Sequence, residues 1–340
     1  MHLFRLLLCL LLTYPGFARH GFAWHGFAGQ IHAKHHQDTL QDYRFYHQQI
    51  AGAQEAIVNR QYDQALAQYE TVFSRYSFIF LRDYQVATQL ALQTGQRDKA
   101  FTYLRKGIAG GWTWKSVTRN AFLKPLTADP QWKQLRDDYP ALRAAYTAKL
   151  NLPVREKVRK MFGKDQRKAL GALLTVGPKA QERYAIKRFA PHSQRQLAAL
   201  RNIMLTVGYP SEQRIGTDLW ASVILSHHNS ISQAHAQQDT LYPALKPYLW
   251  QAVMSGQMSP YAYAKIEEWY VVIQSGHTGK HTAFLADKLT RQELNEANQR
   301  RQALGLSTVE TINGLLGLQQ QTGMKFYLPL HVFTQTTIME

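Results

Sequence analysis

The chain has 340 residues, of which 45% are hydrophobic and 19% are charged. This composition is typical of a folded protein and excludes a disordered chain, and the length suits two ordinary domains. The formal net charge of +17 at pH 7 predicts attraction to polyanions, which include nucleic acid, anionic lipid and envelope polysaccharide.

The first residues have the layout of a secretory signal peptide. Arg5 precedes an apolar run from Leu6 to Leu12, which Pro15 interrupts. The run is shorter than the roughly 20 apolar residues of a membrane-spanning helix. The sequence therefore predicts export to the periplasm or the exterior, with no transmembrane segment in the mature chain. A buried N-terminal helix is the structural alternative. We assign residues 1–28 to the signal peptide and a low-complexity extension in which Gly-Phe-Ala recurs.

Export limits the chemistry and the partners that we expect. Cys9 is the only cysteine and lies within the signal peptide, so disulfides and thiol chemistry are excluded from the mature chain. An exported protein does not meet genomic DNA, and we therefore expect no nucleic-acid partner. The basic surface instead favours an anionic envelope polymer.

Apolar residues spaced by three and four predict consecutive helices from about residue 42. Four apolar stripes share this spacing, and they comprise Tyr43, Tyr46, Ile50, Ala53 and Ile57; then Ala65, Leu66, Tyr69, Val72 and Phe73; then Leu81, Tyr84, Ala87 and Leu90; then Ala100, Phe101, Leu104 and Ile108. Such aromatic stripes are more often core than ligand cage.

The four predicted helices repeat in pairs. The segment Asn59–Leu66 aligns with Thr94–Phe101, and the offset from Ala65 to Ala100 is 100 − 65 = 35 residues. A small alanine at one point in each hairpin lets the paired helices approach closely. The segment from about 42 to 110 therefore resembles tetratricopeptide repeats, whose period is about 34 residues. We predict an all-α fold in which a tetratricopeptide-like solenoid over 31–150 precedes a second helical domain.

The segment 151–189 reads as a basic connector. Glycines at 163, 171 and 177 interrupt it, which predicts short helices and loops. A charge run of this kind is usually a solvated face. If the segment binds polyanions, the candidate residues are Arg155, Lys157, Arg159, Lys160, Lys164, Arg167 and Lys168.

The predicted second domain covers 190–340 and is again helical. Ser259-Pro260 predicts a helix start, because a capping residue precedes proline at the first helical position. Thr290 with Glu293, and Ser307 with Glu310, predict capping boxes. The last residues, from Lys325 to Ile338, are rich in aromatic and β-branched side chains, which favours a short extended tail.

Several short motifs follow one another in this half: Gly208-Tyr209-Pro210, Gly216, His228 and the segment Asn298–Leu306. In this order they resemble an uncharacterised bacterial family, a domain of unknown function often attached to helical repeats. The resemblance covers about 190–315. Tyr209 stands where the family has Trp, His227 stands where it has Gln, and its Gln-x-Tyr-Gly-Thr-Gln stretch has no counterpart. The resemblance implies architecture and no chemistry.

His227 and His228 are the sharpest candidates for chemistry, with Glu267 as a carboxylate partner. Both histidines lie near the apolar face of a predicted helix, where a histidine is either catalytic, metal-bound or hydrogen-bonded within the core. Adjacent helical residues point about 100° apart, so the two do not easily bind one metal. We favour core histidines over a site.

A metal site is the alternative, with His228, His277 and His281 as its candidates. His277 and His281 have the four-residue spacing of a helical metal pair, but nearby glycines predict a loop. Glu267 and Glu268 are expected to face solvent. Arg300 and Arg301 suit either an anion site or a brace between the last helices, and we favour the brace. No cofactor motif is present, and we predict no cofactor.

Three functions follow from these patterns. The leading hypothesis is a protein-interaction module of the bacterial envelope, because stacked hairpins offer a surface for a protein or peptide partner. The first alternative is a metal-dependent or His-based hydrolase in the second domain. The second alternative is a polyanion-binding envelope protein.

Overall fold

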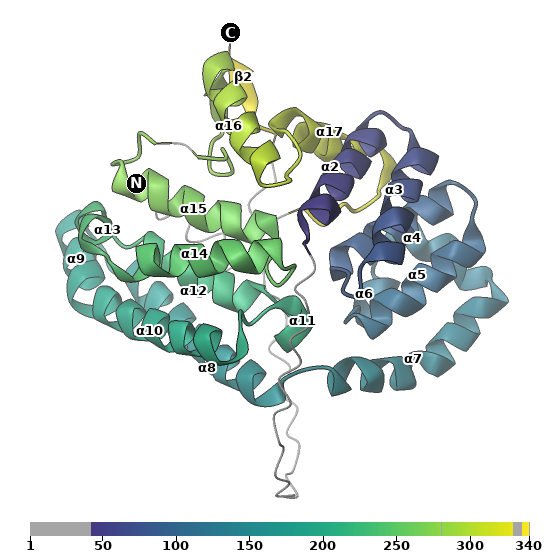
Figure 1. Ribbon diagram of the computed structural model, residues 1–340, viewed down its shortest axis with the longest axis horizontal. Coiled ribbons are helices and arrows are strands. Elements are labelled where there is room, and N and C mark those ends of the chain that lie inside the picture. The colour runs from purple at the N-terminus through teal and green to yellow at the C-terminus, as the bar shows by residue number, and fades with distance from the viewer. Residues whose placement is uncertain (1–41, 280, 329–334, 340) are drawn as a thin grey trace, which may run out of the picture.

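The computed structural model describes residues 42–279, 281–328 and 335–339. Over these ranges the chain is almost entirely helical, which confirms the predicted all-α fold (Figure 1). None of the described helices is long and apolar enough to cross a bilayer. The predicted signal peptide and low-complexity extension lie outside the described residues, so export stays a prediction.

Two antiparallel helical hairpins open the described chain. Their helices are α2 (Arg44–Val58), α3 (Tyr62–Arg75), α4 (Leu81–Gln93) and α5 (Arg97–Ala109). Each helix packs on the next in sequence, and the repeat alanines Ala65 and Ala100 are fully buried. The close approach expected at those alanines is therefore present, although membership of a repeat family stays a prediction.

The stack continues beyond the second hairpin. It contains α6 (Trp114–Thr118), the 3₁₀ helix η1 (Ala121–Ala128) and α7 (Pro130–Ala148). Asp129 caps α7 by accepting a hydrogen bond from the Gln131 amide, and α7 packs against α5. We call the whole of 42–148 the solenoid half.

The segment expected to consist of short helices and loops begins with one long helix, α8 (Leu152–Leu173). The expectation was wrong because Gly163 and Gly171 are tolerated inside a helix whose apolar face is buried. Val158, Met161 and Ala169 are buried on that face, and α8 packs on α10 and α12. The helix therefore packs within the second half, while the division of the chain into domains stays a prediction.

The second half is a compact group of helices (Figure 1). They are α9 (Pro178–Tyr184), the π-helix η2 (Ala185–Phe189), α10 (Ala190–Val207), α11 (Glu212–Ile215), α12 (Leu219–Asn229), α13 (Gln233–Gln238), α14 (Leu241–Met254) and α15 (Pro260–Gln274). The start of α15 is as predicted, because the Ser259 hydroxyl accepts a hydrogen bond from the Tyr261 amide.

The last elements are α16 (Arg291–Ala303), α17 (Val309–Thr322) and two short parallel strands, β1 (Lys288–Thr290) and β2 (Thr337–Met339). Thr290 and Glu293 form the predicted capping box. The second predicted box was wrong by one residue, because Thr308 rather than Ser307 caps α17. Ser307 instead hydrogen-bonds Gln54 in the solenoid half.

The largest hydrophobic cluster among the described residues takes side chains from both halves, from Tyr43 near the start to Phe326 near the end. Two smaller clusters lie in the second half. After α17 the chain returns along the solenoid half, where Gln89 of α4 donates a hydrogen bond to the Lys325 carbonyl and accepts one from the Lys325 amide, both at 2.8 Å. Met324 and Phe326 on either side are buried. The chain's own segment 324–327 thus covers this surface of the solenoid.

We expect Phe326→Ala to lower the free energy of unfolding by about 3–5 kcal/mol, because it removes a buried ring from the shared core. Urea unfolding followed by circular dichroism and by tryptophan fluorescence should still give one transition, at a lower midpoint. Tyr248→Ala removes an exposed ring (42% exposed) and serves as the control. Two separate transitions, or an unchanged midpoint, would contradict a shared core.

Candidate functional site

A cavity of about 210 Å³ lies where the two halves of the chain meet. Its walls come from α2, the first turn of α4, α11, the start of α12 and the start of α15. The volume far exceeds the roughly 10–15 Å³ that one water molecule requires, so the cavity has room for a small ligand. Its ionisable lining residues are His47, Arg82, Asp83, Glu212, Asp218 and Lys265.

Arg82 and Asp83 stand side by side in the first turn of α4. Nε of Arg82 lies 3.5 Å from Oδ1 of Asp83, and the guanidinium covers the Tyr261 ring at 4.6 Å. The Tyr46 hydroxyl donates to Oδ2 of Asp83 at 2.6 Å. Burial raises the pKa of Asp83, and the charge of Arg82 opposes that rise. Asp83 thus holds the Arg82 guanidinium on the cavity wall, and the contact with Asp83 uses only the Nε edge of the guanidinium.

Glu212 is the only residue of α11 on the cavity wall. Its Oε1 accepts a hydrogen bond of 2.7 Å from the Leu81 amide, at the N-terminus of α4. Burial between the two halves raises the pKa of Glu212 to about 8, and the nearby Asp218 carboxylate adds to the rise. The Glu212 side chain is therefore mainly protonated at neutral pH.

Lys265 is a buried lysine (7% exposed) on α15, and Asp218 at the start of α12 is its electrostatic partner. Burial lowers the pKa of Lys265 to about 8, and Asp218 opposes that fall. Burial likewise raises the pKa of Asp218. On the opposite wall, burial lowers the pKa of His47 to about 4, so this imidazole is neutral.

The cavity thus combines two cationic side chains, Arg82 and Lys265, with carboxyl groups and aromatic walls. Groups whose pKa values are displaced toward neutrality by a shared cavity are typical of binding and catalytic sites. Sequence reasoning missed this site. The available signals were Glu212, within the Gly208–Gly216 motif, and Lys265, a charge between the apolar neighbours Ala264 and Ile266.

The structure separates the predicted histidine pair. Nδ1 of His227 lies 2.6 Å from Oδ2 of Asp165 on α8, so His227 makes the contact with a neighbouring helix that the core interpretation predicts. His228 lies instead between Ser193 of α10, 3.0 Å from its Nδ1, and Asp239, 3.0 Å from its Nε2.

Ser193, His228 and Asp239 have the connectivity of a nucleophilic triad. Ser193 is fully buried, and its hydroxyl faces Nδ1 of the histidine inside the core. A nucleophile must reach its substrate, so this serine does not fit that role. The triad geometry therefore does not support the His-based hydrolase, although the hypothesis stays untested.

The expectation that Glu267 and Glu268 face solvent was wrong, since both are buried. Glu267 accepts a hydrogen bond from Tyr242 and pairs with Lys246. Glu268 accepts from the Thr282 hydroxyl and from backbone amides of residues 281–283. The loop after α15 needs these acceptors because its amides are otherwise buried without partners. Both carboxylates thus have structural contacts.

His277 and His281 do not lie beside His228. The candidate metal cluster among the described residues consists of His228, His235 and Asp239. His277 is exposed with a φ of 72°, and the His281 amide donates to Glu268. Residues 277–279 and 281 are not helical, as the nearby glycines predicted, so the four-residue spacing does not form a helical metal pair.

Arg301 is the brace that the sequence favoured. Its buried guanidinium donates to the carbonyls of Ser307 and Thr282, at 2.7 and 3.0 Å, and lies over the Phe284 ring. It connects the end of α16 to two loops through backbone carbonyl acceptors. Arg300 lies 3.6 Å from Glu296 on the same helix.

Three of the polyanion candidates line a groove of about 370 Å³ between α8 and α10. They are Lys157, Lys160 and Lys164, which Arg195 of α10 joins from the other side. Arg155 lies elsewhere, since it donates to the Ile215 carbonyl and stacks on Trp220. Arg159 pairs with Glu156. Arg167 is exposed and Lys168 half-buried, and neither lines the groove.

Comparisons of this chain with family models, with curated proteins and with solved structures find no match. The two resemblances seen in the sequence therefore stay predictions.

We expect Glu212→Gln to remove a fall in stability between about pH 5 and pH 8. In this window folded Glu212 keeps a proton that the unfolded chain has released, so wild-type stability decreases as pH rises through the folded pKa of about 8. The slope is at most about 1.4 kcal/mol per pH unit, and cavity water reduces it. Above pH 8 the titration of Lys265 makes stability rise with pH, because folded Lys265 loses a proton that the unfolded chain retains.

The measurement is the Tm of wild type and variant across pH 5–9. Glu182→Gln, at an exposed position, is the matched control and should follow the wild-type curve. Parallel curves for wild type and Glu212→Gln would show that Glu212 titrates normally.

Proposed function

We propose that this protein binds a small zwitterionic molecule, of the amino-acid class, in the cavity between its two halves. One observation carries the proposal: Arg82 and Lys265 on the cavity wall stand together with the carboxyl groups of Glu212 and Asp218. The carboxylate of an amino acid matches Arg82 and Lys265, and its ammonium group matches the Asp218 carboxyl group and the oxygen atoms of protonated Glu212. Because such a ligand has no net charge, its binding also leaves the net charge of the buried site unchanged.

The hydrogen-bonding capacity of the walls supports the same ligand class. The ammonium of Lys265 has a charge partner in Asp218 but no hydrogen bond or ion pair to another described residue. Oδ1 of Asp83 accepts no hydrogen bond from a described residue, and its contact is the ion pair of 3.5 Å with Nε of Arg82. Both groups therefore keep hydrogen-bonding capacity that a ligand with a donor and an acceptor can use.

Aromatic side chains complete the recognition surface. Tyr46, Phe80 and Tyr261 lie on the cavity wall beside the charged groups. Such rings favour a ligand with an apolar or aromatic body and cover its carbon atoms from water. The proposal is therefore a zwitterion with a hydrophobic side chain rather than a bare sugar or a polyanion.

We expect zwitterionic amino acids to raise the Tm, while probes that carry one of the two charges have little effect. The assay is a thermal-shift series with the standard amino acids, compared with matched simple amines and carboxylic acids, and followed by calorimetry. Lys265→Met and Asp218→Asn should each weaken binding about tenfold or more, because each removes one charged contact. Lys149→Met, at an exposed position, should bind as wild type. Equal shifts with single-charge probes would contradict the proposal.

The basic groove supports a second candidate function, the binding of an anionic envelope polymer. Lys157, Lys160 and Lys164 recur at intervals of three and four on one face of α8, and Arg195 faces them. Four cations around one groove concentrate positive potential there. The groove is separate from the cavity, so both functions are compatible in one protein.

We expect the double change Lys157→Glu and Lys164→Glu to weaken binding to a sulfated polysaccharide by about tenfold or more, since each cation near an anionic surface contributes about 1 kcal/mol. Binding by wild type should weaken steeply with added salt. Lys124→Glu with Lys133→Glu is the matched control, because it makes the same net-charge change on the exposed surface of the solenoid half. Equal losses in both double variants would indicate attraction by net charge alone.

The protein-interaction hypothesis remains a proposal, and the structure leaves a smaller part of the solenoid half open to a partner. The segment 324–327 of the chain itself covers the surface around Gln89. A protein or peptide partner in the envelope must therefore use another face of the solenoid half or displace this segment.

A further inference from the structure

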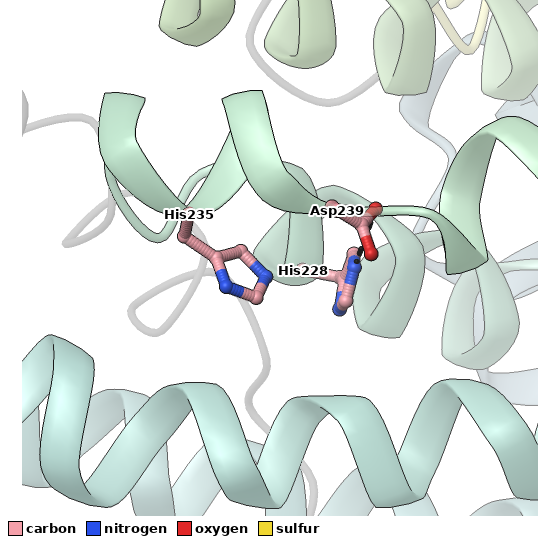
Figure 2. Close-up of side chains that lie close together, drawn as sticks. All are labelled: His228, His235 and Asp239. Atoms are coloured by element: carbon pink, nitrogen blue, oxygen red, sulfur yellow. Dashed lines mark ion pairs between the residues drawn. The ribbon is translucent and has the colours of Figure 1, made fainter.

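Three side chains from consecutive elements meet at the C-terminal end of α12, whereas the cavity lies at its N-terminal end. His228 comes from the last turn of α12, His235 from α13, and Asp239 follows α13 directly. One potential ligand atom of each lies within 4.8 Å of the other two. Figure 2 shows the His235 imidazole beside His228 and the Asp239 carboxylate above it, with the ion pair between His228 and Asp239 drawn as a dashed line.

The two imidazoles have ring nitrogens that nothing in the described structure satisfies. Nε2 of His228 and Nε2 of His235 are both buried without a hydrogen-bond partner of acceptable geometry among the described residues. His228 is itself 1% exposed. The 3.0 Å contact of its Nε2 with Oδ2 of Asp239 is close enough for an ion pair but does not have the geometry of a hydrogen bond. Unsatisfied buried nitrogens beside a carboxylate are typical of a metal site without its ion.

The surroundings hold two of these groups in orientations suited to metal binding. Nδ1 of His228 lies 3.0 Å from the Ser193 hydroxyl, which can accept a hydrogen bond from it. In the tautomer in which Nδ1 donates to Ser193, Nε2 is unprotonated and available as a metal ligand. Asp239 accepts hydrogen bonds from the Leu241 and Tyr242 amides, both at 3.0 Å. These bonds fix the carboxylate toward His228.

We propose that His228, His235 and Asp239 bind one divalent transition-metal ion of the zinc class. Two neutral imidazoles and one carboxylate suit Zn²⁺, whose ligands are nitrogen and oxygen in tetrahedral geometry. Three protein ligands leave the fourth position for water. The ion joins the end of α12 to the connection between α13 and α14, so it stabilises the second half independently of any ligand in the cavity.

The test is zinc binding by the full chain and by His235→Gln. His235 is only half-buried, so this change should fold where a change at His228 risks the core. After loading with Zn²⁺ and dialysis, metal analysis should find one equivalent less in the variant. The other histidines of the chain, including those near its start, are present in both proteins and cancel in the difference. His277→Gln, at an exposed position, should retain the wild-type content.

Two further readouts distinguish this site from surface binding. Zn²⁺ should raise the Tm of wild type and His277→Gln, because an ion that binds only the folded state stabilises it, and should have a smaller effect on His235→Gln. Co²⁺ in place of Zn²⁺ should give visible absorption bands of tetrahedral intensity in wild type that His235→Gln lacks. Equal metal content and equal Tm shifts in wild type and His235→Gln would overturn the proposal.

Discussion

The contact between α2 and the last third of the chain holds the two halves together, and the cavity exists because of it. Gln54 of α2 accepts hydrogen bonds from the hydroxyls of Tyr261, at 2.9 Å, and Ser307. The Tyr43 amide donates to the Met254 carbonyl at 2.8 Å. Each of these bonds joins residues more than 200 positions apart in sequence. This contact, which we call the joint, therefore forms only after the segment that carries Ser307 is present.

Glycine is required at two points of this joint. Gly256 has a φ of 70°, and a Cβ there would lie 2.5 Å from the Tyr43 ring. Gly305 also has a φ of 70°, and a Cβ there would lie 2.6 Å from Cβ of His47. Both positions combine left-handed backbone with an approach too close for any side chain. They bring the turns that follow α14 and α16 against Tyr43 and His47 at the start of α2, next to the cavity.

The same joint explains why the ionisable groups of the cavity have displaced pKa values. Glu212 comes from the second half but caps α4 of the solenoid half, so its low solvation depends on both halves being in place. Desolvation is the largest cause of the shift at Glu212, at Lys265 and at Asp83. Ionisable groups buried in this way cost stability unless something pairs with them or they become neutral. Their presence in one cavity, with Arg82 and Lys265 opposite the carboxyl groups, is the physical argument for a ligand of mixed charge.

Local sequence signals predicted much of the fold. Apolar spacing located α2 to α5, and the caps at Ser259 and Thr290 located two later helices, because each signal depends on neighbours a few residues away. The same reasoning failed at α8, where burial against α10 and α12 outweighs the glycines. It also failed for Glu267 and Glu268, whose partners belong to other helices and to the following loop. The cavity was unpredictable because its ionisable walls are drawn from helices on both sides of the joint.

The two proposed sites lie at opposite ends of the helix α12. Asp218, directly before its first residue, faces the cavity, and His228, in its last turn, faces His235 and Asp239. At about 1.5 Å per residue the two positions are roughly 15 Å apart along the axis, too far for one small ligand to touch both. A metal ion at His228 therefore acts on the cavity only by stabilising α12, whose other end holds Asp218 beside Lys265. The ion would set how firmly that carboxylate is held and would leave the chemistry of ligand recognition to the cavity walls.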